Sequence, residues 1–137
     1  MEDRKAPKPV SAQKRNFVRV DVLLPVSFNV VNEQSQRLRR NAPNLGCSVN
    51  LSSGGMLLAT DRELPTGTRL LLTFPLFEGE AEVWTDALVL VSQRQQEGAL
   101  KKFLCHLSFD SPDKDTQDKI MKFIFEKQRS LRRQGIA

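Results

Sequence analysis

The sequence is poor in the residues on which catalysis and metal binding most often depend. It contains 1 histidine, His106, and 2 cysteines, Cys47 and Cys105, in 137 residues. Two distant cysteines are too few for a metal cluster or a disulfide framework. A lone histidine without neighbouring ligands or a paired nucleophile is a poor catalyst or metal ligand. Because the chain also shows no acid–base pair, nucleophile constellation or phosphate loop, we predict a protein that is not an enzyme and that uses no metal or cofactor.

Long apolar runs are also missing. No run of about 18 apolar residues occurs, so a membrane span is not expected. The N-terminus is charged and has no apolar core region, which argues against a secretory signal. Cys47 and Cys105 both lie in alternating apolar segments, which predicts buried free thiols in a reducing compartment. We therefore expect a cytoplasmic protein.

The chain has the length of one domain and carries a basic excess. Its 137 residues suit a single hydrophobic core. Lys and Arg together number 21 against 16 Asp and Glu, a net charge of +5, which favours anionic partners. Residues 1–14 contain Pro7 and Pro9, several charges and no apolar periodicity, and are predicted to form a flexible basic arm. The domain itself is expected over residues 15–134.

Alternation of apolar and polar residues dominates the chain up to residue 109. Six segments show it, and short turn-rich links join them without an intervening helix. This pattern indicates an antiparallel barrel or sandwich. Pro25 interrupts the first segment, which therefore reads as a bent or edge strand. The expected strands cover residues 17–30, 47–52, 56–59, 69–74, 81–91 and 103–109.

The periodicity changes to that of a helix after residue 110. Ser111 is expected to cap it, with Pro112 at the first helical position. Ile120, Phe123 and Ile124 then recur on one face, and arginines crowd the C-terminal end. We predict one helix over about residues 112–133, packed on the sheet structure.

Two short patches carry the functional prediction. In an extended segment, Arg15 and Arg19 lie on one side of the strand, and each guanidinium can bind phosphate or the acceptor edge of guanine. Asn50 and Ser52 share another strand face while Val49 and Leu51 enter the core.

A glycine pair follows the second patch. Gly54 and Gly55 allow a positive φ and a close approach by a flat ring. Together the patches predict a receptor for an anionic nucleotide, although each alone is commonly a solvated pair of charges or ordinary turn chemistry.

The order and spacing of these residues resemble the signature of the PilZ domain family. In that signature Arg-x-x-x-Arg, here Arg15 and Arg19, precedes Asp/Asn-x-Ser-x-x-Gly, here Asn50, Ser52 and Gly55. The resemblance implies a six-stranded antiparallel β-barrel with one packed C-terminal helix, and it implies binding of the second messenger cyclic di-GMP. The arginines would grip guanine and phosphate, Asn50 and Ser52 would contact guanine or its phosphate, and Gly55 would keep the turn open.

Two further residues are secondary candidates for the ligand site. Lys14 stands where the family often has another arginine and would supply phosphate charge. Trp84, on an outward strand face, would stack on a base or anchor a partner. Asn50 replaces the commoner aspartate, a charged acceptor for the guanine donors, so binding is expected to be weaker with Asn50.

The resemblance also implies a signalling role. Ligand binding would order the segment from Lys14 to Arg19 against the barrel, and another protein would read the changed surface. The helix resembles that of the flagellar-brake branch of the family, which points by analogy to motility or biofilm control. Two alternatives stay open: a PilZ-type interaction module that binds no nucleotide, and a small basic barrel that binds single-stranded nucleic acid.

Overall fold

The structure is a computed structural model that describes residues 18–31, 44–97 and 100–133. It contains seven strands and one long helix in these ranges. Their bounds are β1 (Arg19–Asp21), β2 (Pro25–Val30), β3 (Asn44–Ser52), β4 (Gly55–Thr60), β5 (Arg69–Phe74), β6 (Val83–Glu97), β7 (Leu100–Phe109) and α3 (Lys114–Arg133).

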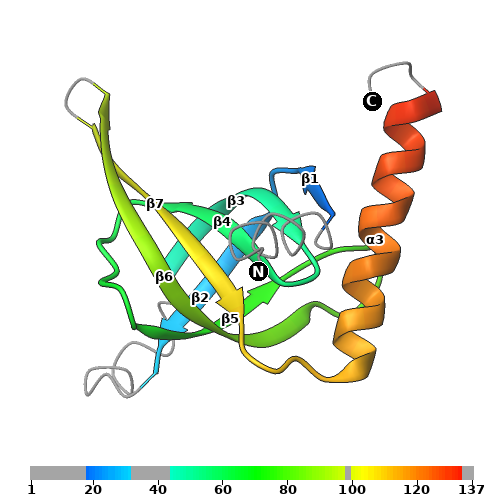
Figure 1. The fold of residues 1–137 in the computed structure, drawn as a ribbon, viewed down its shortest axis with the longest axis horizontal. Coiled ribbons are helices and arrows are strands. Elements are labelled where there is room, and N and C mark those ends of the chain that lie inside the picture. The colour runs from blue at the N-terminus through cyan, green and yellow to red at the C-terminus, as the bar shows by residue number, and fades with distance from the viewer. Residues whose placement is uncertain (1–17, 32–43, 98–99, 134–137) are drawn as a thin grey trace, which may run out of the picture.

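The strands close into a barrel. Hydrogen-bonded neighbours run in the order β3-β2-β5-β6-β7-β4, and β4 pairs again with β3, so six antiparallel strands form a ring. The short β1 is added to β3 beside this ring. Figure 1 shows the barrel with α3 along one side and the β6–β7 hairpin projecting beyond it. Closure confirms the six-stranded barrel and rules out the sandwich that the alternating pattern had also allowed.

The first predicted strand is divided in two at its proline. Pro25 begins β2, and residues 22–24 separate it from β1. The buried hydroxyl of Ser48 on β3 bridges this break, because it accepts a hydrogen bond of 2.8 Å from the Leu24 backbone N–H and donates one to the carbonyl of Val22. Side-chain hydrogen bonds thus replace ladder bonds where the strand bends.

Two β-bulges interrupt the alternation. The register of β3 against β4 shifts between Ser48 and Asn50, which makes Val49 the extra residue. The register of β6 against β7 shifts between Val89 and Val91, with Leu90 extra. The prediction that Val49 enters the core is therefore wrong: Val49 is only half-buried, and Ser48 and Leu51 point inward instead.

Beyond the second bulge, Val91 is 45% exposed although the alternation predicted it to be buried. Cys47 is likewise only partly buried, whereas Cys105 lies fully in the core. Burial raises the pKa of the Cys105 thiol, and its contact with the Ser92 hydroxyl partly offsets that rise. The expectation of two buried thiols thus holds for Cys105 alone.

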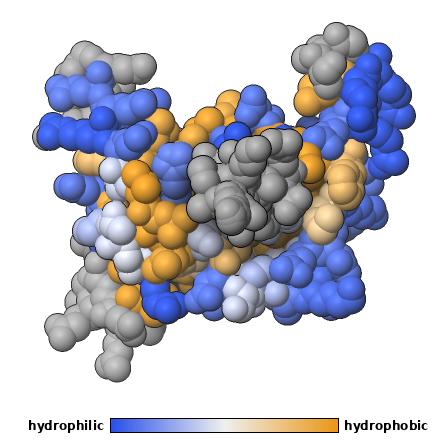
Figure 2. All heavy atoms as spheres, viewed as in Figure 1, coloured by the Kyte–Doolittle hydropathy of each residue, from blue (hydrophilic) through white to orange (hydrophobic). Residues whose placement is uncertain are grey.

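The helix covers one side of the barrel and begins two residues later than predicted. Its cap is Asp113, whose Oδ1 accepts a hydrogen bond of 2.7 Å from the Thr116 backbone N–H. Ser111, the predicted cap, instead adopts a left-handed φ of 51° in the connection. Ile120, Phe123 and Ile124 are buried as expected. Hydrophilic residues cover most of the rest of α3, as the face in Figure 2 shows.

No helix in the described ranges is long and apolar enough to cross a membrane. Residues 1–14, predicted to form the arm, lie outside the described residues.

Candidate functional site

The two sequence patches meet where β1 lies against β3. Arg19 is directly opposite Ser52, and Asp21 is opposite Asn50. Opposed residues in an antiparallel pair project to the same face with Cβ atoms about 5 Å apart. Arg19, Asn50 and Ser52 therefore share one outer face of the barrel, so the part of the prediction that can be compared with the structure is spatially consistent.

These residues line one cavity of about 350 Å³. That volume is at the lower end of the range for small-molecule sites, about 300–1,000 Å³. The cavity crosses the outer faces of β1, β3, β4, β7 and β6. Its lining residues are Arg19, Asn50, Ser52, Gly54, Gly55, Met56, Leu57, Leu90, His106, Leu107 and Ser108.

Arg19 and Asn50 supply the groups that are free to bind. The Arg19 side chain is exposed and the Asn50 side chain is half-buried. Neither forms a hydrogen bond or ion pair with another residue in the described part of the chain. One guanidinium fork and one amide thus face the cavity with their donors and acceptors available.

Ser52 has a different role in this structure. Its hydroxyl accepts hydrogen bonds from the backbone N–H groups of Gly54, at 3.2 Å, and Gly55, at 3.1 Å. It also donates to the Gly55 carbonyl at 3.3 Å. One donor and two lone pairs are then all in use. Ser52 is 8% exposed and fixes the turn that bounds the cavity, which is the turn chemistry that the sequence had left open as an alternative.

Gly55 is required for a reason that the sequence did not reveal. A positive φ occurs only at Gly67 and Gly79 among the described glycines, so neither Gly54 nor Gly55 uses the positive φ that glycine allows. A Cβ atom at position 55 would instead lie 2.0 Å from the backbone carbonyl oxygen of Leu107. Glycine therefore allows β4 to approach β7 at the floor of the cavity.

The remaining predicted residues are not part of this lining. Lys14 and Arg15 lie outside the described residues. Trp84 is 61% exposed near the start of β6, opposite Thr73, and it does not line the cavity. Leu90, the β6 residue that does, is roughly 20 Å further along the strand at 3.3 Å per residue.

The cavity also contains side chains that sequence reasoning missed. His106 is exposed, as its alternation indicated, yet it lines the cavity together with Leu57 and Leu90. Only the pairing of β4 with β7 brings His106 near the asparagine patch. No local pattern in the sequence signals that proximity.

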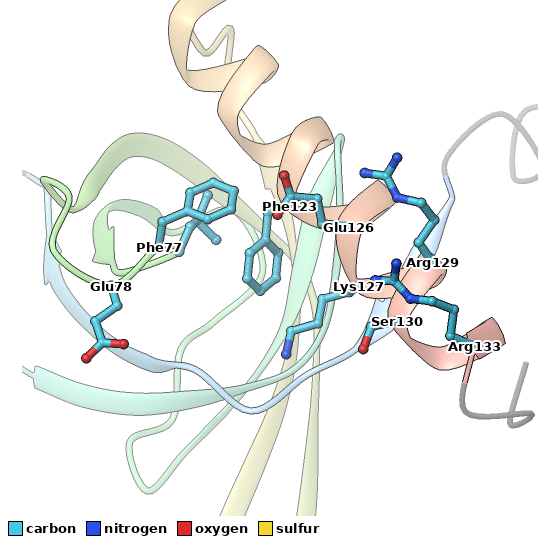
Figure 3. A pocket seen from close by; sticks show the side chains of 9 residues that line it. Phe77, Glu78, Phe123, Glu126, Lys127, Arg129, Ser130 and Arg133 are labelled. Carbon is cyan, nitrogen blue, oxygen red and sulfur yellow. The ribbon is translucent and has the colours of Figure 1, made fainter.

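A second, larger cavity of about 600 Å³ lies between α3 and the connection from β5 to β6. Figure 3 shows Phe77 and Phe123 turned toward each other there, edge to face with centroids 5.7 Å apart. Lys127 Nζ lies 5.8 Å from the Phe123 ring centroid. Glu78 and Glu126 line the same cavity. Its chemistry is aromatic and of mixed charge.

The described residues include no cluster of three or more His, Cys, Asp or Glu side chains that could hold a metal ion.

Comparison with known proteins places the fold. The model of the PilZ domain family matches residues 13–126. No curated protein sequence matches the chain. Among solved structures, the PilZ domain with c-di-GMP of YcgR from Escherichia coli is 15% identical with a TM-score of 0.67, and the match covers 90% of this chain and 98% of that one.

Two longer proteins share the same fold. The Bacillus subtilis inhibitor of motility MotI/DgrA is 19% identical with a TM-score of 0.65, over 85% of this chain and 52% of that one. The K. pneumonia MrkH–c-di-GMP complex is 15% identical with a TM-score of 0.66, over 88% of this chain and 55% of that one. This chain thus spans about half of either protein. With most of its length matched by the family model, the chain belongs to the PilZ domain family.

Proposed function

We propose that this chain is a non-enzymatic receptor for cyclic di-GMP and that the ligand binds in the cavity beside β1. The observation that carries the proposal is the register of β1 on β3, which sets Arg19 against Ser52 and beside Asn50. The YcgR and MrkH structures similar to this chain are described as containing c-di-GMP, which supports the choice of ligand.

The available groups suit this ligand. Cyclic di-GMP carries two phosphates and two guanines, and a guanidinium binds either a phosphate or the O6/N7 edge of guanine in bidentate fashion. Arg15, four residues before Arg19, is proposed as the second fork, with Lys14 adding charge. The Asn50 amide reads a base edge, and Ser52 with Gly55 holds the turn beneath it.

Isothermal titration of the full chain with cyclic di-GMP tests the proposal, with GTP and single-stranded DNA as control ligands. We expect micromolar or tighter binding of cyclic di-GMP alone. Arg19→Ala should weaken it more than about tenfold, the equivalent of about 1.5 kcal/mol for a lost charged hydrogen bond. Arg129→Ala, which removes an exposed arginine at the other cavity, is the matched control and should bind normally.

Asn50 offers a test in the opposite direction. Asn50→Asp introduces a charged acceptor for the guanine N1 and N2 donors, so we expect tighter binding by several-fold. Wild-type protein that binds none of the ligands would favour the alternative of an interaction module. Binding of single-stranded DNA with strong salt dependence would favour the nucleic-acid alternative.

We also propose that the ligand joins the segment from Lys14 to Arg19 to the barrel and that another protein responds to this change. Two phosphates between the arginines would remove their mutual repulsion. Hydrogen exchange of residues 1–18 with and without cyclic di-GMP tests this step, and slower exchange is expected on binding. Motility or biofilm control is the proposed process, because a motility inhibitor shares the fold.

A further inference from the structure

The far side of the ligand cavity, away from Arg19, is built by a bulge. Val89 is opposite Leu107 and Val91 is opposite His106, so Leu90 is the extra residue of β6. A bulge re-aims side chains and recurs beside binding sites. Leu90 is 48% exposed, and it lines the cavity with His106.

The strand register places His106 in line with Asn50 across the cavity. Asn50 on β3 is opposite Leu57 on β4, and Leu57 is opposite His106 on β7. These three residues form one row across three neighbouring strands, and all three line the cavity. Since neighbouring strands lie about 4.8 Å apart, Asn50 and His106 stand roughly 10 Å from each other across the row. A ligand with a flat bicyclic ring can span that distance.

The row has a polar group at each end and the apolar Leu57 between them, and Leu90 lies on β6, beyond His106. Leu57 and Leu90 offer apolar contact to a ring face, while the imidazole offers N–H donors. Besides His106, the one residue with a charged side chain in the lining is Arg19 on β1. The lining residues near His106 on the other strands do not titrate near neutral pH: they are Asn50 on β3, Leu57 on β4, Leu90 on β6 and Ser108 on β7. No carboxylate among the lining residues competes for an imidazolium, so an anionic ligand is its natural partner.

We propose that Leu90 and His106 form a second ligand-contacting wall, in which protonated His106 donates a hydrogen bond to an acceptor atom of cyclic di-GMP. This inference rests on the proposed function. Binding then takes up a proton, so affinity rises as the pH falls.

Titration of the full chain with cyclic di-GMP between pH 5.5 and 8.5 tests the wall. A stabilised imidazolium increases affinity by up to about tenfold over this range, the equivalent of one pKa unit. His106 is the only histidine of the chain, and His106→Gln keeps a flat polar side chain that does not titrate. We expect this variant to bind cyclic di-GMP more weakly than the wild type at low pH and to show no gain in affinity as the pH falls.

The leucine provides a second readout. Leu90→Ser should lower affinity about threefold or more at every pH and keep the pH dependence. Val91→Ser is its matched control, because Val91 is 45% exposed beside Leu90 but does not line the cavity. Equal affinity at all pH values, or a pH dependence that survives in His106→Gln, would overturn the inference while the proposed function stands. Absence of binding at every pH would overturn both.

Discussion

The cavity beside β1 and the groove beside α3 differ in how they are built. The ligand cavity, about 350 Å³, crosses the outer faces of paired strands. The groove beside α3, about 600 Å³, lies between a helix and a connection. The larger of the two is lined by two glutamates as well as by Lys127, Arg129 and Arg133, so its charge is mixed. The smaller has no carboxylate in its lining and has an unpaired guanidinium and amide. The absence of carboxylates from its lining favours the smaller cavity for the proposed dianionic ligand, although its volume is the lower of the two.

The two cavities also differ in what positions their lining residues. At the ligand cavity, backbone pairing sets the positions of Arg19, Asn50 and His106. At the groove, the long cationic side chains of Lys127, Arg129 and Arg133 all stand on one helix, α3, as Figure 3 shows. Strand register thus sets the backbone positions of these three residues before any ligand binds, whereas the groove would have to order several flexible side chains.

The largest effect is expected from a substitution at Gly55, which tests whether close strand pairing builds the cavity beside β1. Gly55→Ala places a Cβ about 2.0 Å from the Leu107 carbonyl oxygen, and two paired backbones must separate to relieve it. We expect a loss of more than about 3 kcal/mol in the free energy of unfolding, at or beyond the upper end of ordinary overpacking. Urea denaturation measures it.

Gly79→Ala is the control for that change, because it adds the same methyl group. Nothing lies within 4 Å of a Cβ there, but φ is +81°. Left-handed strain should cost about 1–2 kcal/mol. If both variants lost the same stability, the contact between β4 and β7 would not explain the glycine.

Phe123→Ala tests the groove in the opposite way. Phe123 is 5% exposed and packs edge to face on Phe77. Truncation should lower the free energy of unfolding by about 3 kcal/mol through the cavity that it leaves. Affinity for cyclic di-GMP should stay within twofold, since α3 does not line the ligand cavity. A tenfold loss of affinity in folded protein would show that the two regions are coupled.

Much of the fold could be predicted because period-two alternation persists along most strands. Leu70, Leu72 and Phe74 are buried as the pattern requires, and so are Phe103 and Leu107. The pattern failed at Val49 and Val91, where bulges shift the register. At Val49 the apolar–polar alternation continues through Ser48 and Asn50, and at Leu90 both neighbours are apolar, so the alternation marks neither inserted residue.

The sequence indicated only those candidate site residues that lie near one another in the chain. Asn50, Ser52 and Gly55 are near one another in the sequence, and their spacing places them on one turn. His106 and Leu90 come from strands that meet this turn only in the closed barrel. The need for glycine at position 55 also depends on Leu107, on a strand some fifty residues away, so the local sequence could not reveal it.

Ser52→Ala should moderately lower both the stability of the protein and its affinity for cyclic di-GMP. The hydroxyl makes hydrogen bonds to Gly54 and Gly55, and its removal leaves their backbone N–H groups without that acceptor. A loss of about 1–3 kcal/mol in the free energy of unfolding is expected for partners left unpaired in a buried site. Calorimetry should also show weaker cyclic di-GMP binding as the turn loosens. Unchanged stability would restore Ser52 to the direct ligand role first predicted for it.

Asp113 gives the smallest expected effect, confined to low pH and to α3. The hydrogen bond from the Thr116 backbone N–H lowers the pKa of the Asp113 carboxyl below its ordinary value. The folded state therefore binds this proton less readily than the unfolded chain does. Its stabilisation is complete above the unfolded value of about 3.9 and is lost as the pH falls through the lower folded value.

Asp113→Asn keeps a capping side chain but cannot titrate. The melting temperature of the wild type should exceed that of the variant by a few degrees or less at pH 7, and the difference should shrink below about pH 4. Thermal unfolding followed by circular dichroism measures the difference across this range. A constant difference would mean that the charge of the cap contributes nothing. The affinity for cyclic di-GMP should be the same in both proteins at pH 7, because Asp113 does not line the proposed ligand cavity.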